Sequence, residues 1–132
     1  MSLIQLVDFP ILGDSRGYLI ALEESKDISF QIKRVYYIFG TKEGVARGFH
    51  AHKELEQLAI CVSGKCRMLM NDGSNSESVW LDSPSKGIYI GKNVWHEMHD
   101  FSPDCVLLVM ASEYYDESDY IRDYNSFLEF LS

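Results

Sequence analysis

Short apolar segments separated by turn-forming residues recur along most of the chain. Segments 34–39 and 79–81 are rich in β-branched and aromatic residues, which favour extended strands. Segments 58–62 and 105–110 are continuous apolar runs, typical of strands buried on both faces. Between such segments lie turn residues, and Asp72-Gly73 has the composition of a hairpin turn. The pattern predicts an antiparallel sandwich or barrel of many short strands.

The periodicity changes near the C-terminus. Apolar side chains at 121, 124, 127, 128 and 131 follow helical spacing, and Ser118 or Asp119 could cap the helix. We therefore expect a helix from about Tyr120 to Leu131. The sequence contains no repeat, linker or low-complexity segment. It predicts an all-β barrel with a short C-terminal helix, organised as one domain over residues 1–132.

The charge distribution narrows the choice of ligand. The chain has 132 residues and a net charge of −8, which argues against binding a nucleic-acid polymer because such proteins need a basic face. Residues 31–53 nevertheless contain five basic side chains and one acid, whereas residues 100–132 contain eight acids and one arginine. A basic island in an acidic protein suits a small anionic ligand, although Lys33, Lys42 and Lys53 could simply solvate the surface.

Two further features of the sequence bear on the cellular compartment of the protein. No apolar run approaches the ~20 residues of a membrane helix, and the N-terminus lacks the basic and small-residue signals of a secretory leader. The three cysteines, Cys61, Cys66 and Cys105, are too few for a disulfide framework. We expect a cytoplasmic protein that does not associate with membranes.

Histidine, arginine and glutamate gather in two short segments, 47–56 and 95–100. His50 and His52 are two residues apart, so in a strand they project from the same face. His96 follows the apolar run 88–90. Two imidazoles at this spacing, with Arg47 three residues earlier, indicate a functional site rather than isolated surface histidines.

The spacing resembles the first cupin motif, with Gly44, His50, His52, Glu56 and Gly64 at the motif's positions. Residues 87–96 occupy the place of the second motif, although the usual Pro-x-Gly before its histidine is missing. The resemblance implies a jelly-roll barrel. His50, His52, Glu56 and His96 could supply three imidazoles and a carboxylate to a non-haem metal, so a metal-dependent cupin oxygenase or isomerase is one alternative.

A more specific resemblance covers nearly the whole chain. It rests on DSRG at 14–17, IKRVYYIF at 32–39, RGFHAHK at 47–53, LEQ at 55–57, LDSP at 81–84, VWHEMHDF at 94–101 and YYDESDYIR at 114–122. These segments resemble the cupin-type TDP-4-keto-6-deoxyglucose 3,4-ketoisomerases. The resemblance implies conversion of a TDP-linked 4-keto-6-deoxyhexose to the 3-keto sugar, most closely the galacto form, without metal or cofactor. An aminotransferase then makes a 3-amino-3,6-dideoxyhexose.

The resemblance and the chemistry together suggest a role for each candidate residue. By similarity His50 is the base that removes the C3 proton, with His52 assisting, because imidazole titrates near neutral pH. Arg47 could stabilise the enediolate, or instead form an ion pair with Glu54 or Glu56. Tyr37 is the candidate hydrogen-bond donor to the sugar. Tyr36 and Tyr37 point to opposite faces of a strand, so only one can reach the pocket.

The remaining candidates would bind the nucleotide or the hexose. Arg122 is expected to hold the diphosphate, with Arg16 and Lys33 as further contacts. Arg122 could alternatively pair with helix carboxylates. Trp95 could stack on thymine, and Arg16 and His96 could select the face of reprotonation. The family implies a homodimer, in one form with exchanged N-terminal strands, which the apolar segment 3–7 would suit. A non-catalytic sugar-nucleotide-binding cupin is the other alternative.

Overall fold

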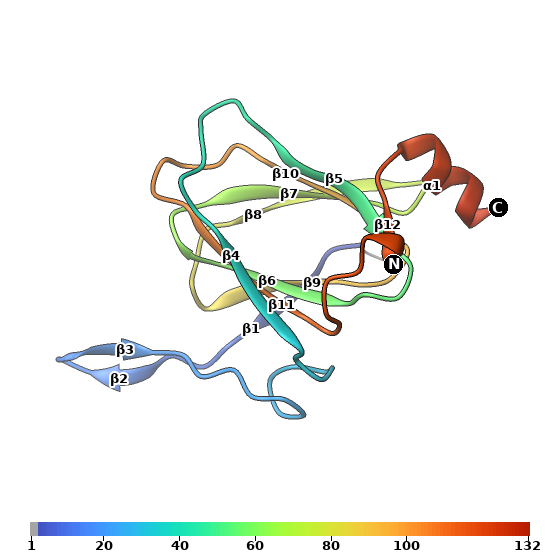
Figure 1. Ribbon diagram of the computed structural model, residues 1–132. Coiled ribbons are helices and arrows are strands. Elements are labelled where there is room, and N and C mark those ends of the chain that lie inside the picture. Colours follow the sequence, from blue (N-terminus) through green and yellow to red (C-terminus); the bar gives the residue numbers. More distant parts are fainter. Residues whose placement is uncertain (1–2) are drawn as a thin grey trace.

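Two five-stranded antiparallel sheets lie face to face and enclose the core (Figure 1). The coordinates are a computed structural model that describes residues 3–132. The first sheet has the order β1 (Gln5–Asp8), β9 (Lys86–Ile90), β6 (Gln57–Ser63), β11 (Val106–Ala111) and β4 (Arg34–Ile38). The second has the order β12 (Tyr120–Ile121), β5 (Arg47–His52), β10 (Trp95–His99), β7 (Cys66–Asn71) and β8 (Ser76–Leu81). This architecture confirms the predicted antiparallel jelly-roll barrel.

The alternation of inward and outward side chains along the strands explains which residues form the core. In β7 the inward residues Cys66, Met68 and Met70 are buried and their neighbours are half-buried. Of the apolar run 58–62 predicted to be buried on both faces, Leu58–Cys61 is buried, whereas Val62 is exposed near the end of β6. Asp72 accepts backbone hydrogen bonds from Ser74 and Asn75, which closes the expected hairpin between β7 and β8.

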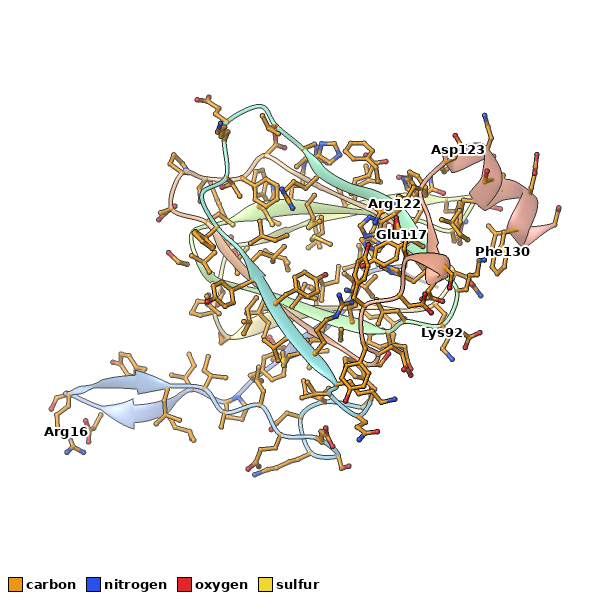
Figure 2. All side chains as sticks on the ribbon, in the orientation of Figure 1. Arg16, Lys92, Glu117, Arg122, Asp123 and Phe130 are labelled. Carbon is orange, nitrogen blue, oxygen red and sulfur yellow. The ribbon has the colours of Figure 1, made fainter. Side chains whose placement is uncertain are left out.

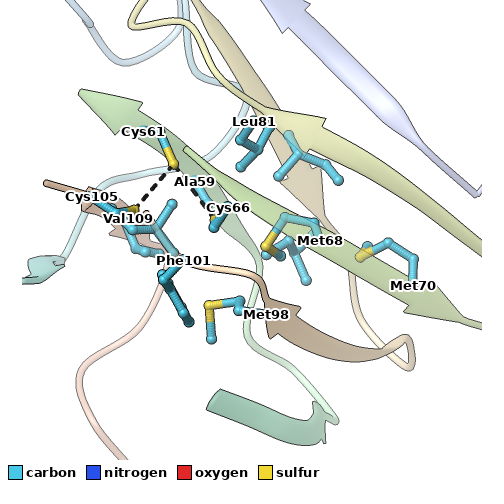
Figure 3. Packing of buried hydrophobic residues seen from close by; sticks show 13 residues of the cluster. Ala59, Cys61, Cys66, Met68, Met70, Leu81, Met98, Phe101, Cys105 and Val109 are labelled. Carbon is cyan, nitrogen blue, oxygen red and sulfur yellow. Dashed lines mark hydrogen bonds between the residues drawn. The ribbon is translucent and has the colours of Figure 1, made fainter. Parts of the chain in front are cut away.

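Sulfur-bearing side chains fill one end of the core (Figure 3). The Sγ atom of Cys61 lies 3.6 Å from that of Cys66 and 3.7 Å from that of Cys105. All three are free thiols, as their number predicts. Contact with Cys66 and burial raise the pKa of the Cys61 thiol well above its usual range. The trio is therefore a protonated, apolar part of the core.

The strands β2 (Leu12–Asp14) and β3 (Gly17–Leu19) form a hairpin arm that projects from the barrel (Figure 1). Arg16 lies at its tip, where its guanidinium is bonded to Asp14 (Figure 2). Gly13 has a φ of 133°, and a Cβ there would lie 2.2 Å from the carbonyl oxygen of Gly17, so the tight turn needs glycine. Most of the arm's apolar side chains are exposed, including Tyr18 at 81%.

The C-terminal helix is shorter than predicted. Helix α1 spans Tyr124–Leu131, and its N-cap is Asp123, whose carboxylate accepts from the backbone N–H of Ser126. Tyr120 and Ile121 pair instead with β5 as strand β12. The expected cap Asp119 is used elsewhere, because it ends the 3₁₀ turn Glu117–Asp119 and its carboxylate accepts the N–H groups of Glu54 and Leu55.

A β-bulge interrupts β5 directly before the two histidines. His50 pairs with His96 and Gly48 pairs with Glu97, so Phe49 is an extra residue in the strand. Gly48 and Phe49 have φ values of 90° and 62°. A Cβ at Gly48 would lie 3.0 Å from the carbonyl oxygen of His96, which restricts this position to glycine. Arg47, opposite the core residue Met98, consequently shares the inner face with His50.

No helix among residues 3–132 has the length and apolar character needed to cross a bilayer.

Candidate active site

Three imidazoles meet inside the barrel. His50 and His52 project from β5, and His96 projects from the paired strand β10. The ring of His50 lies 4.8 Å from that of His52 and 4.6 Å from that of His96, measured between centroids. The predicted grouping of His50 and His52 with His96 is thus present in the structure. In the described residues both ring nitrogens of His52 and the Nδ1 atom of His50 are buried without a hydrogen-bond partner.

Burial keeps these imidazoles neutral. It lowers the pKa of His50 to about 4, with the Arg122 charge acting in the same direction. Burial and the neighbouring histidines lower the pKa of His52 to about 2 and that of His96 to about 3. His96 is held by its Nδ1 atom, 3.2 Å from the carbonyl oxygen of Val94. At neutral pH all three rings are in the form that accepts a proton.

Tyr36, rather than Tyr37, faces the imidazoles. The Tyr36 hydroxyl accepts a 2.7 Å hydrogen bond from the buried amide of Gln57, which leaves its own proton free to be donated. Burial raises the pKa of Tyr36 to about 12. Tyr37 lies on the outer face of β4 and is 61% exposed. The choice of Tyr37 was therefore wrong: the alternation of β4 places its neighbour inside.

The mouth of the barrel is formed by the segment that follows β11. The Tyr120 ring lies 5.1 Å from the ring of His50 and 4.4 Å from that of His52. Arg122 stacks on Tyr120, with its guanidinium carbon 4.4 Å from the ring centroid. Two hydrogen bonds join Arg122 to Glu117 (Figure 2). A cavity of about 550 Å³ opens beside Tyr120, lined by Arg34, Glu54, Leu55, Glu113, Tyr114, Tyr115, Asp116, Asp119 and Tyr120.

Arg47 lies on the same inner face without either of its suggested partners. Glu54 pairs with Lys92, and the Glu56 carboxylate accepts a hydrogen bond from the Tyr89 hydroxyl. Arg47 therefore keeps its charge available at the end of β5 that precedes the bulge.

Three predicted ligand residues lie away from the imidazoles. Trp95 is next to His96 in β10 and so points to the opposite face, where it packs on Tyr124 and Phe127 and donates to Glu97. It is a core residue beneath α1, and its prediction as a thymine-stacking group was wrong. Lys33 is paired with Glu113 outside the imidazole cluster. Arg16 is at the tip of the projecting arm, far from Arg122 (Figure 2).

The donor set partly fits a metal. Ligand atoms of His50, His52 and His96 lie within 4.8 Å of one another, close enough for three imidazoles to share an ion. Glu56, the carboxylate expected to complete a cupin metal site, is not in this group and is held by Tyr89. Three neutral imidazoles without the carboxylate also suit proton transfer, where unpartnered ring nitrogens are needed.

Two side chains at this site were not predicted from the sequence. Tyr120 covers His50 and His52, and Arg34 lines the mouth between Tyr36 and Tyr115. Arg34 and Tyr36 are two residues apart in a strand, so their shared face could have been inferred once Tyr36 was placed inside.

The fold and the site define a jelly-roll protein with three neutral imidazoles and a tyrosine inside its barrel and cationic groups at the rim. The family described as FdtA: WxcM-like, C-terminal matches residues 2–132. The chain belongs to this family.

Its relatives include enzymes of known name. The chain is 55% identical over 128 residues to a TDP-4-oxo-6-deoxy-alpha-D-glucose-3,4-oxoisomerase of Aneurinibacillus thermoaerophilus, covering 97% of this chain and 92% of the relative. A 3,4-ketoisomerase from Helicobacter canadensis has a TM-score of 0.96 and 49% identity, covering 99% and 98% of the two chains. A mutant of the 3,4-ketoisomerase QdtA from Thermoanaerobacterium thermosaccharolyticum, in complex with TDP-4-keto-6-deoxyglucose, has a TM-score of 0.94 and 43% identity, covering 96% and 92%.

Proposed function

We propose that this chain is a sugar-nucleotide 3,4-ketoisomerase. Its substrate is TDP-4-keto-6-deoxyglucose and its product the TDP-linked 3-keto-6-deoxyhexose, in the galacto form. The observation that carries the proposal is the group of three neutral imidazoles beside a protonated tyrosine inside the barrel. The named activities of the relatives, at 43–55% identity, support the same reaction.

The reaction transfers one carbon-bound proton from C3 to C4 and one hydroxyl proton from O3 to O4, and the carbonyl thereby moves from C4 to C3. A base removes the proton from C3, and the electron pair of that C–H bond forms the C3–C4 double bond as the C4 carbonyl becomes an enediolate oxygen. The enediolate oxygen at C4 takes up a proton and becomes the C4 hydroxyl. The C3 hydroxyl then loses its proton as its oxygen becomes the new carbonyl, and the electron pair of the C3–C4 double bond takes up a proton to form the C4–H bond. Atoms and electrons balance without an external oxidant.

Each step has a group suited to it. His50 is the proposed base, because its Nδ1 atom has no partner and burial keeps it neutral. His52, 4.8 Å away between ring centroids, assists the proton transfer. Tyr36, in place of Tyr37, donates its hydroxyl proton to a sugar oxygen. Arg47 supplies positive charge on the same inner face.

The product's configuration depends on which face of the enediol is reprotonated at C4. We propose that His96, inside the barrel, and Arg16, from the arm of a second chain, select this face. Lys33 remains a minor candidate for contact with the nucleotide, because Glu113 already pairs with it.

The function is tested by incubating the protein with TDP-4-keto-6-deoxyglucose in deuterated water. We expect NMR to show a 3-keto product with deuterium at C4, and the coupling constants to report the galacto configuration. Activity should persist after chelation. Loss of turnover on chelation, restored by one iron or zinc per chain, would favour the metal-dependent alternative. Tight binding of the substrate without any exchange would favour a non-catalytic binding protein.

Arg122 is the proposed diphosphate ligand, since a guanidinium binds phosphate through two parallel hydrogen bonds. It now makes such a pair with Glu117, which the diphosphate would replace. Arg122→Ala should weaken TDP binding by roughly 1.5–3 kcal/mol, or about 10- to 150-fold in Kd. Calorimetric titration with TDP measures this change in Kd. The control is Arg67→Ala, which breaks an ion pair with Asp100. If Arg122→Ala leaves the Kd unchanged, Arg122 does not bind the diphosphate and serves only to pair with Glu117.

We also propose a homodimer, because apolar surface gathers on the arm and the outer face of the first sheet. Tyr18, Tyr37 and Phe39 are 61–81% exposed. A cavity of about 600 Å³ between arm and sheet is lined by Ile11, Tyr18, Leu19, Ile20, Leu22, Ile60, Val62, Pro84 and Leu108. A monomer rarely exposes a continuous apolar area of this kind. A second copy would cover it. The strand expected to be exchanged, β1, pairs with β9 of its own chain here, so we propose that the arm is exchanged instead, which would bring Arg16 to the partner's barrel.

Light scattering at micromolar concentration should therefore give twice the 15.2 kDa chain mass. Phe39→Glu should shift the protein toward monomer because it places a charge in the interface. Trp80→Glu is the matched control, an exposed aromatic on the second sheet that should leave the mass unchanged. A wild-type monomer under these conditions would contradict the dimer. The cytoplasmic location stays a prediction.

A further inference from the structure

Arg34 is half-buried at the mouth of the barrel, and part of its guanidinium lacks hydrogen-bond partners in the described structure. It begins β4, two residues before Tyr36, so both side chains share the inner face. Its guanidinium carbon lies 5.2 Å from the Tyr36 ring centroid and 5.7 Å from that of Tyr115. Its Nε and Nη2 atoms are buried and have no hydrogen-bond partner within residues 3–132.

The nearby carboxylates are already engaged. Glu113 pairs with Lys33, Glu117 pairs with Arg122, and Asp119 accepts two backbone N–H groups. A guanidinium stays charged at any physiological pH and has donors but no acceptor. Burying such a group without an anion is unfavourable, and stacking on two tyrosines compensates only in part. The arrangement is therefore suited to an anion that arrives with the ligand.

Two anions are available on a TDP-sugar: the diphosphate and the oxyanion that forms on the hexose. The position of Arg34 favours the second. Its guanidinium stacks on Tyr36, and Tyr36 lines one small cavity together with His50 and His96, so Arg34 lies next to the groups proposed to transfer protons. Arg122, by contrast, lies outside Tyr120 at the rim and is half exposed.

We infer that Arg34 is a catalytic residue that donates hydrogen bonds to the enediolate oxygen of the hexose. This inference rests on the proposed ketoisomerase function. When C3 is deprotonated, negative charge develops on the oxygen at C4, and when C4 is reprotonated the oxygen at C3 becomes the carbonyl. A fixed cation with free donors beside Tyr36 stabilises the charge without reorganising. Arg34 thus acts together with Tyr36 in the transition state.

The test compares Arg34→Gln and Arg34→Lys with the wild type. For Arg34→Gln we expect kcat to fall by about 10²–10³-fold, the usual effect of removing an oxyanion donor. TDP lacks the hexose, so its Kd should change little. The melting temperature should not fall, because the substitution removes a charged group whose buried Nε and Nη2 atoms have no hydrogen-bond partner. Arg34→Lys should recover part of kcat, because it retains the charge but not the planar fork of donors. Arg67→Gln is the control for loss of an arginine outside the barrel.

Each contrary result has a definite meaning. A loss of TDP affinity as large as the loss of kcat/KM would assign Arg34 to the diphosphate and overturn the inference. A lower melting temperature with normal kcat would make it a structural stack between Tyr36 and Tyr115. Full activity of Arg34→Gln alongside an active wild type would refute only the role of Arg34. An inactive wild type would instead refute the proposed function itself.

Discussion

Replacing His50 by asparagine should lower the rate of isomerisation by about 10²–10⁴-fold, the range expected when a general base is lost. Asparagine keeps much of the size and hydrogen-bonding capacity of the imidazole but cannot accept the C3 proton. The substrate should still bind, because Arg122, and not His50, is proposed to hold the diphosphate. His50 has the free Nδ1 atom and the neutral ring that a base requires.

Exchange of solvent deuterium at C3 and C4 is the decisive measurement. His50→Asn should abolish exchange at C3 while its Kd for TDP stays close to that of the wild type. His52→Asn is the matched comparison, and it should reduce the rate less because His52 only assists. If His50→Asn exchanges fully and His52→Asn does not, then His52 is the base.

The second large effect concerns the two adjacent tyrosines of β4. Tyr36→Phe should reduce kcat by about 10²-fold, because it removes the one proton donor that Gln57 holds in place inside the barrel. Tyr37→Phe makes the same chemical change one residue further along, on the outer face, and should leave kcat unaltered. Steady-state kinetics of both variants test the assignment. A loss confined to Tyr37→Phe would return the role to Tyr37.

The sequence predicted the barrel because several strands carry their own signals. The segments rich in β-branched and apolar residues correspond to β4, β6, β8, β9 and β11, and the Asp72-Gly73 turn joins β8 to the strand before it. The helix start was misplaced because helical spacing at Ile121 is also compatible with a strand. Pairing of Tyr120 and Ile121 with β5 is a long-range contact that local periodicity does not contain.

The site was predicted only in part for a related reason. The grouping of His50 and His52 followed from strand alternation, and His96 came from the second cupin-like segment. Which of two adjacent residues in a strand faces the barrel interior depends on the register of that strand in the sheet, and local sequence does not contain this information. The predictions of Tyr37 and Trp95 as site residues were wrong for this reason. The sequence did not predict Arg34, because a single sequence does not reveal that nitrogens of an arginine are buried without a hydrogen-bond partner.

The bulge at Phe49 has a consequence for insertions and deletions in β5. Arg47 and His50 are an odd number of residues apart, yet both face the barrel, because one extra residue is absorbed between them. A deletion of Gly48 or Phe49 would restore regular alternation and keep both side chains inward, while drawing them closer together. A deletion between His50 and His52 would instead turn one imidazole outward. A change of one residue at the bulge therefore leaves Arg47, His50 and His52 facing inward. The same change between His50 and His52 does not.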